Sequence, residues 1–282
     1  MYTGRQGYRL GLMGYPLGHS LSPKIHAAAL KACKLEGEYS LYPIAPNDLY
    51  GLKQLLNQLR SGELRGLNVT IPHKQNVIEY LDELTPTARA IGAVNTIYVR
   101  DGMLLGENTD APGFLADLKH FLHLSPLILH PSAVVLGAGG SARAVVHALL
   151  RDGWQVTVAA RQLEQARQLA LSFPGGAIRT TQFNDFRLAT FDLLVNTTPL
   201  GMTPNIDSSP LPEQFSFPPR SAVYDLVYNP RETKLVRAAR AQGLNAANGL
   251  GMLIEQAALA FEIWTGQSPL RDVLRRSVEA DF

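Results

Sequence analysis

The sequence predicts an α/β protein with two domains, and three observations support this fold class. The chain has 282 residues, which is enough for two separate hydrophobic cores. Hydrophobic residues make up 46% of the chain and charged residues 18%, as in ordered globular proteins. Strand-like and helix-like segments alternate along the sequence, and after Asp110 they do so in the manner of a parallel sheet with helices on both faces.

The first third of the chain alternates short apolar runs with helical patterns of apolar residues. A serine before a proline, Ser22-Pro23, is a typical N-cap and first-turn pair of a helix. Asp101-Gly102, between two apolar runs, indicates a two-residue β-hairpin. We therefore expect, in order, a strand at 8–13, a helix from Ser22, a helix from Asn47, a buried strand at 64–71 ended by Pro72, a helix carrying 77–81, and hairpin strands at 94–99 and 103–105.

Beyond Asp110 the sequence predicts a second α/β domain. A helix at 113–122 leads into it, and the Pro-rich stretch 210–219 is typical of a loop. Strands are expected at 133–137, 154–159, 192–196 and 222–226, and C-terminal helices at 250–264 and after Ser268-Pro269. We expect one domain to comprise residues 1–111 and 249–282 and the other residues 112–248, with the C-terminal helices returning to the first domain.

A glycine-rich turn follows the first strand of the second domain, and an apolar helical pattern follows the turn. A strand, a tight turn and a helix N-terminus together suit a pyrophosphate, which accepts hydrogen bonds from backbone N–H groups. The alternative is that the glycines only form a tight βα turn. The pattern predicts a Rossmann-like, parallel-sheet dinucleotide domain with contacts from Gly137, Ala138, Gly139, Gly140, Ser141 and Ala142.

A residue just beyond the end of the next predicted strand indicates which dinucleotide binds. An acidic residue there would bind the ribose 2′-hydroxyl and repel a 2′-phosphate, but this chain has Arg161. A guanidinium favours the phosphorylated ribose through charge-assisted hydrogen bonds. NADP is therefore expected in preference to NAD, the alternative being that Arg161 is only a solvated arginine at a strand end.

Composition excludes several other classes of protein. The formal net charge is +2, and no basic cluster with interleaved aromatic residues occurs, which argues against a nucleic-acid partner. Cys33 is the only cysteine, so the sequence offers neither an internal disulfide nor a cysteine-rich metal site, and we expect no metal. No signal peptide and no membrane-spanning stretch is recognised, so a cytoplasmic location and no membrane partner are expected.

Two serines near the first predicted helix are candidates for binding an anion. Ser20 and Ser22 lie at or just before the positive end of that helix, where hydroxyls and backbone donors suit a carboxylate. The alternative is that Ser22 only caps its own helix.

Two charged residues in the first domain are candidates for acid–base chemistry. Lys74 follows the proline at the exit of a buried strand, and such a lysine can transfer a proton when its surroundings tune its pKa. His73 is an alternative acid, although a structural role suits it better. Asp110 could orient the Lys74 ammonium or merely cap the following helix, and Asn95 adds an uncharged hydrogen-bonding group in the same region.

Polar residues also end two strands of the second domain. Asn196-Thr197-Thr198 and Asp225-Leu226-Val227-Tyr228 lie at carboxyl ends of strands, where α/β sheets bind ligands. Gln256 lies on an otherwise apolar helix surface. A buried glutamine needs a partner, and a ligand hydroxyl would serve.

Taken together, six motifs resemble those of the shikimate dehydrogenase family, including its shikimate/quinate members. They occur in the family's order, and the similarity runs from Gly14 to Gln267. The motifs are His19-Ser20-Leu21-Ser22-Pro23, Asn68-Val69-Thr70-Ile71-Pro72-His73-Lys74, Gly92-Ala93-Val94-Asn95-Thr96, Asn108-Thr109-Asp110, the glycine turn, and Gly249-Leu250-Gly251-Met252-Leu253.

The resemblance implies a role for each candidate residue. Lys74 and Asp110 are implied to be the catalytic pair, placed beside the nicotinamide in a cleft between two lobes. The implied substrate contacts are Ser20, Ser22 and Tyr228 near the carboxylate, and Thr70, Asn95 and Gln256 at the ring hydroxyls. The implied NADP contacts are the glycine turn, Arg161, Thr197, Leu226, Gly249 and Met252.

One motif departs from the family pattern. The family binds the 2′-phosphate of NADP through an Asn-Arg-Thr turn, which here is Ala160-Arg161-Gln162, and Gln165 stands where a second arginine is common. Only Arg161 remains as a clearly placed cationic contact. The preference for NADP should therefore be weaker than in a fully matching member, with some use of NAD.

The activity implied by the resemblance is the reversible reduction of 3-dehydroshikimate to shikimate with NADPH, a step of chorismate and aromatic amino acid biosynthesis. One alternative is a quinate/shikimate dehydrogenase with relaxed use of NAD and NADP, against which the serine pair and Arg161 argue. Another is a nucleotide-sensing regulatory protein without turnover, which would not need Lys74 and Asp110. A monomer and a homodimer are both compatible with the sequence.

Overall fold

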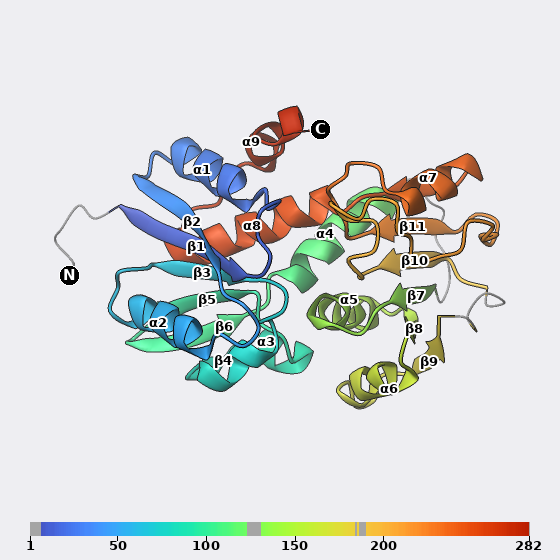
Figure 1. The fold of residues 1–282 in the computed structure, drawn as a ribbon, viewed down its shortest axis with the longest axis horizontal. Helices are drawn as coiled ribbons and strands as arrows, with labels where there is room; N and C mark the ends of the chain where they lie inside the picture. Colours follow the sequence, from blue (N-terminus) through green and yellow to red (C-terminus); the bar gives the residue numbers. More distant parts are fainter. Residues whose placement is uncertain (1–6, 123–130, 184, 186–189, 282) are drawn as a thin grey trace. The chain divides into compact units, whose positions relative to one another are not determined.

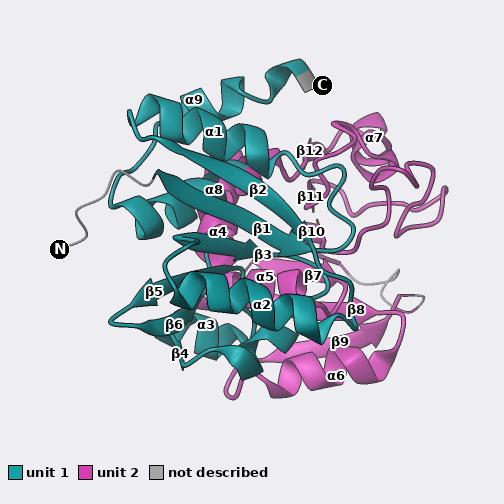
Figure 2. Ribbon diagram, turned by 60° about the vertical axis from the view of Figure 1, so that its left-hand side comes forward, with its two compact units in different colours: residues 1–109, 254–282 teal, residues 110–253 magenta. Residues whose placement is uncertain are grey.

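The computed structural model describes residues 7–122, 131–183, 185 and 190–281 (Figure 1). The chain divides into two compact units. Unit 1 comprises residues 1–109 and 254–282, and unit 2 comprises residues 110–253 (Figure 2). The division therefore falls after Thr109 and within the long C-terminal helix α8, Leu250–Thr265.

Unit 1 contains a mixed six-stranded sheet in the order β2-β1-β3-β5-β6-β4. Strand β1 pairs in parallel with β2 and β3, whereas β5 pairs antiparallel with β3 and β6. Besides part of α8, its elements are β1 (Tyr8–Gly14), α1 (Ser22–Ala32), β2 (Gly37–Pro43), α2 (Leu49–Arg60), β3 (Gly66–Val69), η1 (Asn76–Tyr80), β4 (Glu83–Leu84), α3 (Pro86–Ile91), β5 (Thr96–Arg100), β6 (Met103–Glu107), α9 (Arg271–Arg276) and η3 (Glu279–Asp281).

Helix α2 shows how the sequence builds the core of unit 1. Leu52, Leu55, Leu56 and Leu59 recur at helical spacing, so they lie on one face of α2 and are buried in the core. The last helix, α9, packs against α1 within unit 1, which confirms that the C-terminal segment returns to the first domain.

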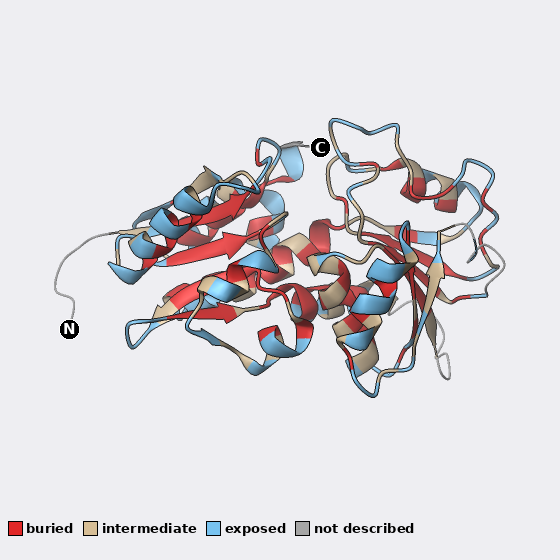
Figure 3. Cartoon of the chain, turned by 60° about the horizontal axis from the view of Figure 1, so that its bottom comes forward, coloured by how far each residue is buried: buried red, intermediate tan, exposed pale blue. Residues whose placement is uncertain are grey.

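Unit 2 contains an all-parallel six-stranded sheet in the order β12-β11-β10-β7-β8-β9. Strands β10 and β11 are buried at every residue, as expected when both faces of a parallel sheet are covered (Figure 3). The elements are α4 (Asp110–Leu122), β7 (Ser132–Leu136), α5 (Gly140–Arg151), β8 (Gln155–Ala160), α6 (Leu163–Leu171), β9 (Ile178–Gln182), β10 (Leu193–Asn196), β11 (Ala222–Asp225), α7 (Lys234–Ala241) and β12 (Asn245–Ala247).

The α/β fold class is confirmed, and several local predictions need correction. Helix α2 begins at Leu49 and not at Asn47, because the Asp48 carboxylate accepts a hydrogen bond from the Gly51 N–H at 2.8 Å and so forms the N-cap. The predicted helix around 77–81 is a single short 3₁₀ segment, η1. The predicted strand 64–71 is confined to β3, and helix α4 begins at Asp110 and not at 113.

Four strands were not predicted, namely β2, β4, β9 and β12. None of them is buried along its whole length, so none has the continuous apolar run that marks a central strand. None of the helices in the described part of the chain combines the length and hydrophobicity that crossing a membrane requires.

Candidate active site

The segment after β1 places the two candidate serines next to each other. The N-cap of α1 is Leu21, which makes no side-chain cap hydrogen bond, and Ser22 is the first residue of the helix. The alternative that Ser22 caps α1 is therefore wrong, because a capping residue stands outside the helix. The Ser20 Oγ instead accepts a hydrogen bond from the Ser22 N–H at 3.3 Å. Both hydroxyl-bearing residues thus lie at the positive end of α1.

The segment after β3 separates the roles of His73 and Lys74. His73 is buried, and its Nε2 lies 2.7 Å from the Ile44 carbonyl oxygen. Because a carbonyl can only accept, Nε2 carries the proton and donates it, which gives His73 a structural role. Lys74 is partly exposed, and its own carbonyl oxygen accepts a hydrogen bond from the Val94 N–H at 2.7 Å. This bond ties the Lys74 segment to the residues just before Asn95.

Asn95 lies at the centre of a buried hydrogen-bond network in unit 1. Its Oδ1 accepts hydrogen bonds from the Thr109 N–H at 2.7 Å and the Thr96 hydroxyl at 3.0 Å. Its Nδ2 donates to the Thr109 Oγ1 at 2.9 Å and to the Gln256 Oε1 at 3.3 Å. Asn95 and Gln256 are 161 positions apart in sequence. The fold therefore joins two residues that the sequence singled out separately.

Asn68 extends the same network, and the sequence gave it no role of its own. Its Nδ2 donates to the Asn95 carbonyl oxygen at 3.1 Å and to the Thr96 Oγ1 at 3.2 Å. Its Oδ1 accepts from the Tyr39 hydroxyl at 2.9 Å. An asparagine inside a strand that is buried at every residue is the sequence signal that points to it, because such an amide requires partners.

The remaining substrate and catalytic candidates fall in different parts of the chain. Thr70 directly follows β3 and is partly buried. Asp110 is the first residue of α4 and of unit 2, and it is 4% exposed. Tyr228 lies in the loop after β11 and is partly buried.

The glycine turn has the form that a dinucleotide site requires. Gly137 has φ +111°, in the region that favours glycine, and a Cβ there would lie 2.6 Å from the Thr197 Oγ1. Gly139 is the N-cap of α5, and a Cβ built on it meets nothing within 4 Å. The turn therefore offers backbone N–H groups and an open approach at the N-terminus of α5, which fits a pyrophosphate. Thr197 donates its hydroxyl to the Leu136 carbonyl oxygen at 2.6 Å.

Arg161 directly follows β8, the strand next to β7, and is exposed. In dinucleotide-binding sheets of this kind, the residue at this position contacts the adenosine ribose. Gln165 is exposed on the first turn of α6, at the place where the family pattern often has an arginine.

Asp225 is a buried carboxyl group at the end of β11, in a segment that the sequence singled out without giving this residue a role of its own. Its oxygens accept hydrogen bonds from the Asn196 Nδ2 at 2.8 Å, the Val227 N–H at 3.1 Å and the Thr233 hydroxyl at 2.7 Å. Burial raises the pKa of Asp225 to about 6, and these three hydrogen bonds act in the opposite direction. Asp225 thereby joins the ends of two neighbouring strands to the start of α7.

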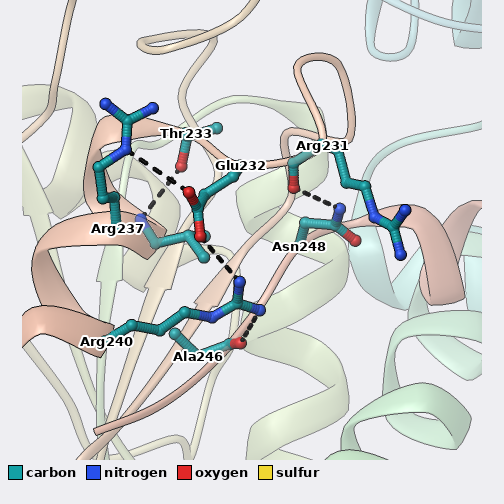
Figure 4. A network of polar contacts seen from close by, with 8 residues as sticks. Arg231, Glu232, Thr233, Arg237, Arg240, Ala246 and Asn248 are labelled. Carbon is teal, nitrogen blue, oxygen red and sulfur yellow. Dashed lines mark hydrogen bonds and ion pairs between the residues drawn. The ribbon is translucent and has the colours of Figure 1, made fainter. Parts of the chain in front are cut away.

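The turn before α8 is held by a second polar network, shown in Figure 4. The Asn248 amide donates to the Arg231 carbonyl oxygen at 2.8 Å and accepts from the Leu250 N–H at 3.1 Å. Between Asn248 and Leu250, Gly249 approaches the Leu226 carbonyl so closely that a Cβ would collide with it. Only glycine fits there, so Leu226 and Gly249 are in contact, while Met252 is buried on the following turn.

The same network secures the neighbouring helix. Glu232 forms ion pairs with Arg240 at 2.9 Å and Arg237 at 3.5 Å, and Arg240 also donates to the Ala246 carbonyl oxygen at 3.0 Å (Figure 4). Among the residues that the structure describes, no group of three or more His, Cys, Asp or Glu side chains is placed to hold a metal ion.

Models of three shikimate dehydrogenase regions match successive parts of the chain. The shikimate dehydrogenase substrate binding domain matches residues 12–97, shikimate / quinate 5-dehydrogenase matches residues 127–209, and the shikimate 5'-dehydrogenase C-terminal domain matches residues 249–279. These ranges include the serine pair, Lys74, Asn95, the glycine turn and Gln256.

Curated relatives and solved structures match over almost the whole chain. The shikimate dehydrogenase (NADP(+)) of Carboxydothermus hydrogenoformans is 42% identical over 276 residues, covering 95% of both chains. A crystal structure of a shikimate dehydrogenase in complex with NADP+ has a TM-score of 0.89 at 35% identity, covering 98% of this chain and 96% of that one. The Thermus thermophilus shikimate 5-dehydrogenase in complex with NADP(H) and shikimate has a TM-score of 0.84 at 39% identity, covering 98% and 100%. The resemblance predicted from the motifs is confirmed, and the chain belongs to the shikimate dehydrogenase family.

Proposed function

We propose that this chain catalyses the reversible reduction of 3-dehydroshikimate to shikimate with NADPH. Membership of the family along the full chain carries the proposal, together with the presence of Lys74 and Asp110 in the family's motifs. In this proposal unit 1 binds the substrate and unit 2 binds the cofactor.

The residues of unit 1 suit a small acid that carries several hydroxyls. Ser20 and Ser22, at the positive end of α1, bind the substrate carboxylate, with Tyr228 beside it. Thr70, Asn95 and Gln256 contact the ring hydroxyls. The hydrogen bond between Asn95 and Gln256 supports this assignment, because it places two amides side by side.

The residues of unit 2 suit NADP. The pyrophosphate lies over the turn from Gly137 to Ala142, where the open approach at Gly139 admits it. Arg161 binds the 2′-phosphate, and the absence of a second arginine at Gln165 leaves some use of NAD. The other proposed contacts are Thr197, Leu226, Gly249 and Met252.

Lys74 and Asp110 are the proposed acid–base pair. When bound, NADPH supplies the hydride that converts the ring carbonyl carbon to a carbinol. The Lys74 ammonium gives a proton to the carbonyl oxygen as negative charge develops there, and takes it back in the reverse direction. Asp110 orients Lys74 and accepts a hydrogen bond from a substrate hydroxyl.

Replacing Lys74 tests this role directly. Lys74→Met should lower kcat by about 10²–10⁴-fold and leave the KM for shikimate nearly unchanged, because only the proton transfer is lost. Lys31→Met, at an exposed position of α1, is the control and should behave as the wild type. Unchanged turnover in Lys74→Met would remove the lysine from the mechanism.

Substrate and cofactor are tested by following reduced nicotinamide with each combination of shikimate or quinate and NADP or NAD. The proposal expects the highest kcat/KM with shikimate and NADP. Efficient oxidation of quinate would indicate the broader quinate/shikimate activity, and cofactor binding without turnover would indicate a sensor.

The oligomeric state, a monomer or a homodimer, is decided by light scattering, and the cytoplasmic location stays a prediction.

A further inference from the structure

The Thr96 hydroxyl lies between the two asparagines of the unit 1 network. Thr96 is the first residue of β5 and is fully buried. Its Oγ1 lies 3.0 Å from the Asn95 Oδ1, 3.2 Å from the Asn68 Nδ2 and 3.2 Å from the Thr109 Oγ1. A residue so buried has no surface to offer to a substrate, so any role in catalysis acts through its neighbours.

Two backbone groups show which atom of each asparagine amide is the oxygen and which is the nitrogen. The Thr109 N–H, which can only donate, meets the oxygen of Asn95 at 2.7 Å. The Asn95 carbonyl, which can only accept, meets the amide nitrogen of Asn68 at 3.1 Å. Because Asn68 also donates to the Thr96 Oγ1, the Thr96 hydrogen is directed to an acceptor, and the Asn95 Oδ1 at 3.0 Å is nearer than the Thr109 Oγ1 at 3.2 Å. The Asn95 Oδ1 also accepts from the Thr109 hydroxyl at 3.2 Å.

The orientation of Asn95 in turn decides that of Gln256. With its oxygen held by Thr96 and the Thr109 N–H, Asn95 directs its NH₂ group toward the Gln256 Oε1 at 3.3 Å. The Gln256 oxygen therefore faces Asn95, and its Nε2 faces the other way. A hydroxyl that binds on that side of Gln256 meets an N–H donor.

We propose that Thr96 is a positioning residue for recognition of the substrate ring, because its hydroxyl holds the Asn95 amide and, through it, directs an N–H donor of Gln256 toward a ring hydroxyl. The inference rests on the proposed function, in which Asn95 and Gln256 contact the ring. Thr96 thereby contributes to selection of a substrate whose hydroxyl oxygen can accept a hydrogen bond at this point.

The test is Thr96→Val, which replaces the hydroxyl with a methyl group of similar size. We expect the KM for shikimate to rise about tenfold, because Asn95 loses a donor and Asn68 an acceptor, while kcat and the KM for NADP stay within about twofold. Thr96→Ser keeps the hydroxyl and should restore the KM for shikimate. Thr96→Ala, which also lacks the hydroxyl, takes the place of the valine variant if that variant does not fold.

A double-mutant cycle separates positioning from a general structural effect. In an Asn95→Ala background, Thr96→Val should raise the KM for shikimate no further, because the group through which it acts is gone. Additive effects would overturn the proposal, as would an unchanged KM in Thr96→Val or a serine variant as impaired as the valine variant. If the wild type fails to oxidise shikimate, the proposed function fails and not this inference alone.

Discussion

The buried carboxyl group of Asp225 has a pKa well above that of an ordinary aspartate. It is 0% exposed, and burial raises its pKa from 3.8 to about 6. The folded protein therefore holds a proton that the unfolded chain has already lost between these two pH values. The stabilising contribution of this group is complete below about pH 3.8 and is lost as the pH rises to about 6.

We predict that Asp225→Asn removes this dependence. The asparagine oxygen can still accept from Asn196 and Val227, and its NH₂ group can donate to the Thr233 hydroxyl, so the network survives without a buried charge. Relative to the wild type, its free energy of unfolding should increase by roughly 2–3 kcal/mol between pH 4 and pH 7. Urea unfolding at a series of pH values measures the difference.

Asp207→Asn is the matched control, because the Asp207 side chain is 93% exposed. It should leave the slope of stability against pH unchanged. An Asp225→Asn protein that is less stable than the wild type at pH 7 would show that the ionised carboxylate holds the two strand ends together.

The contributions of Thr96 and Asn68 to the hydrogen-bond network can be recognised only in the three-dimensional structure. In the sequence each lies within a motif of the family but has no role assigned to it. In the structure they form one side of a network that fixes two amides. Ser22 is the opposite case, because the local sequence suggested a role that the structure does not confirm. Ser22 was expected as a possible helix cap, but the N-cap of α1 is Leu21, one residue earlier.

At the scale of elements, the turn from β7 into α5 depends on two glycines for different reasons. Gly137 has a positive φ and lies against Thr197, so a side chain there strains the backbone and collides with a neighbour. Gly139 has an ordinary φ of −84° and open space around its Cα. The first is required by the fold and the second by the proposed ligand.

We predict that the two alanine variants separate these requirements. Gly137→Ala should lower the free energy of unfolding by more than about 1 kcal/mol, because both the strain and the collision arise in the free protein. Gly139→Ala should keep the wild-type stability and raise the KM for NADP, since its methyl group meets only the cofactor. Thermal unfolding and steady-state kinetics of the two proteins measure these effects.

Equal stability losses in the two variants would contradict this interpretation of the turn. So would a Gly139→Ala protein whose KM for NADP equals that of the wild type, because the open approach at Gly139 would then not be where the pyrophosphate lies.

The elements that the sequence predicted correctly are those whose pattern is complete within a short window. The hairpin is one, because Asp101 and Gly102 both adopt the positive φ that this turn requires, at 52° and 78°. Helix α2 is another, with leucines at helical spacing. Strands β2 and β12 were missed because pairing with β1 and β11 makes them strands, and their own residues carry only a weak pattern.

At the scale of the whole molecule, we predict that the two ligands protect different units. Hydrogen exchange in the presence of NADP should slow at the amides of residues 137–143 in unit 2. Shikimate should instead slow exchange around Asn68 and Asn95 in unit 1. A ligand at about 100 times its Kd stabilises the bound form by about 2.7 kcal/mol, which is readily measured.

Each ligand serves as the control for the other. If NADP protected the Asn68 and Asn95 segments and left the glycine turn unchanged, the assignment of substrate and cofactor to the two units would be reversed.

The sequence by itself determined the fold class, the family and the cofactor, because these follow from motifs whose residues stand close together in the chain. The glycine turn and the Lys74 motif are of this kind. The tertiary structure decided which candidate residues are in contact: Gln256 and Asn95, for example, are hydrogen-bonded although they are 161 positions apart in the sequence. It also decided the direction of each hydrogen bond around Thr96. Such bonds depend on the packing of strands and helices from distant parts of the chain, which no local pattern specifies.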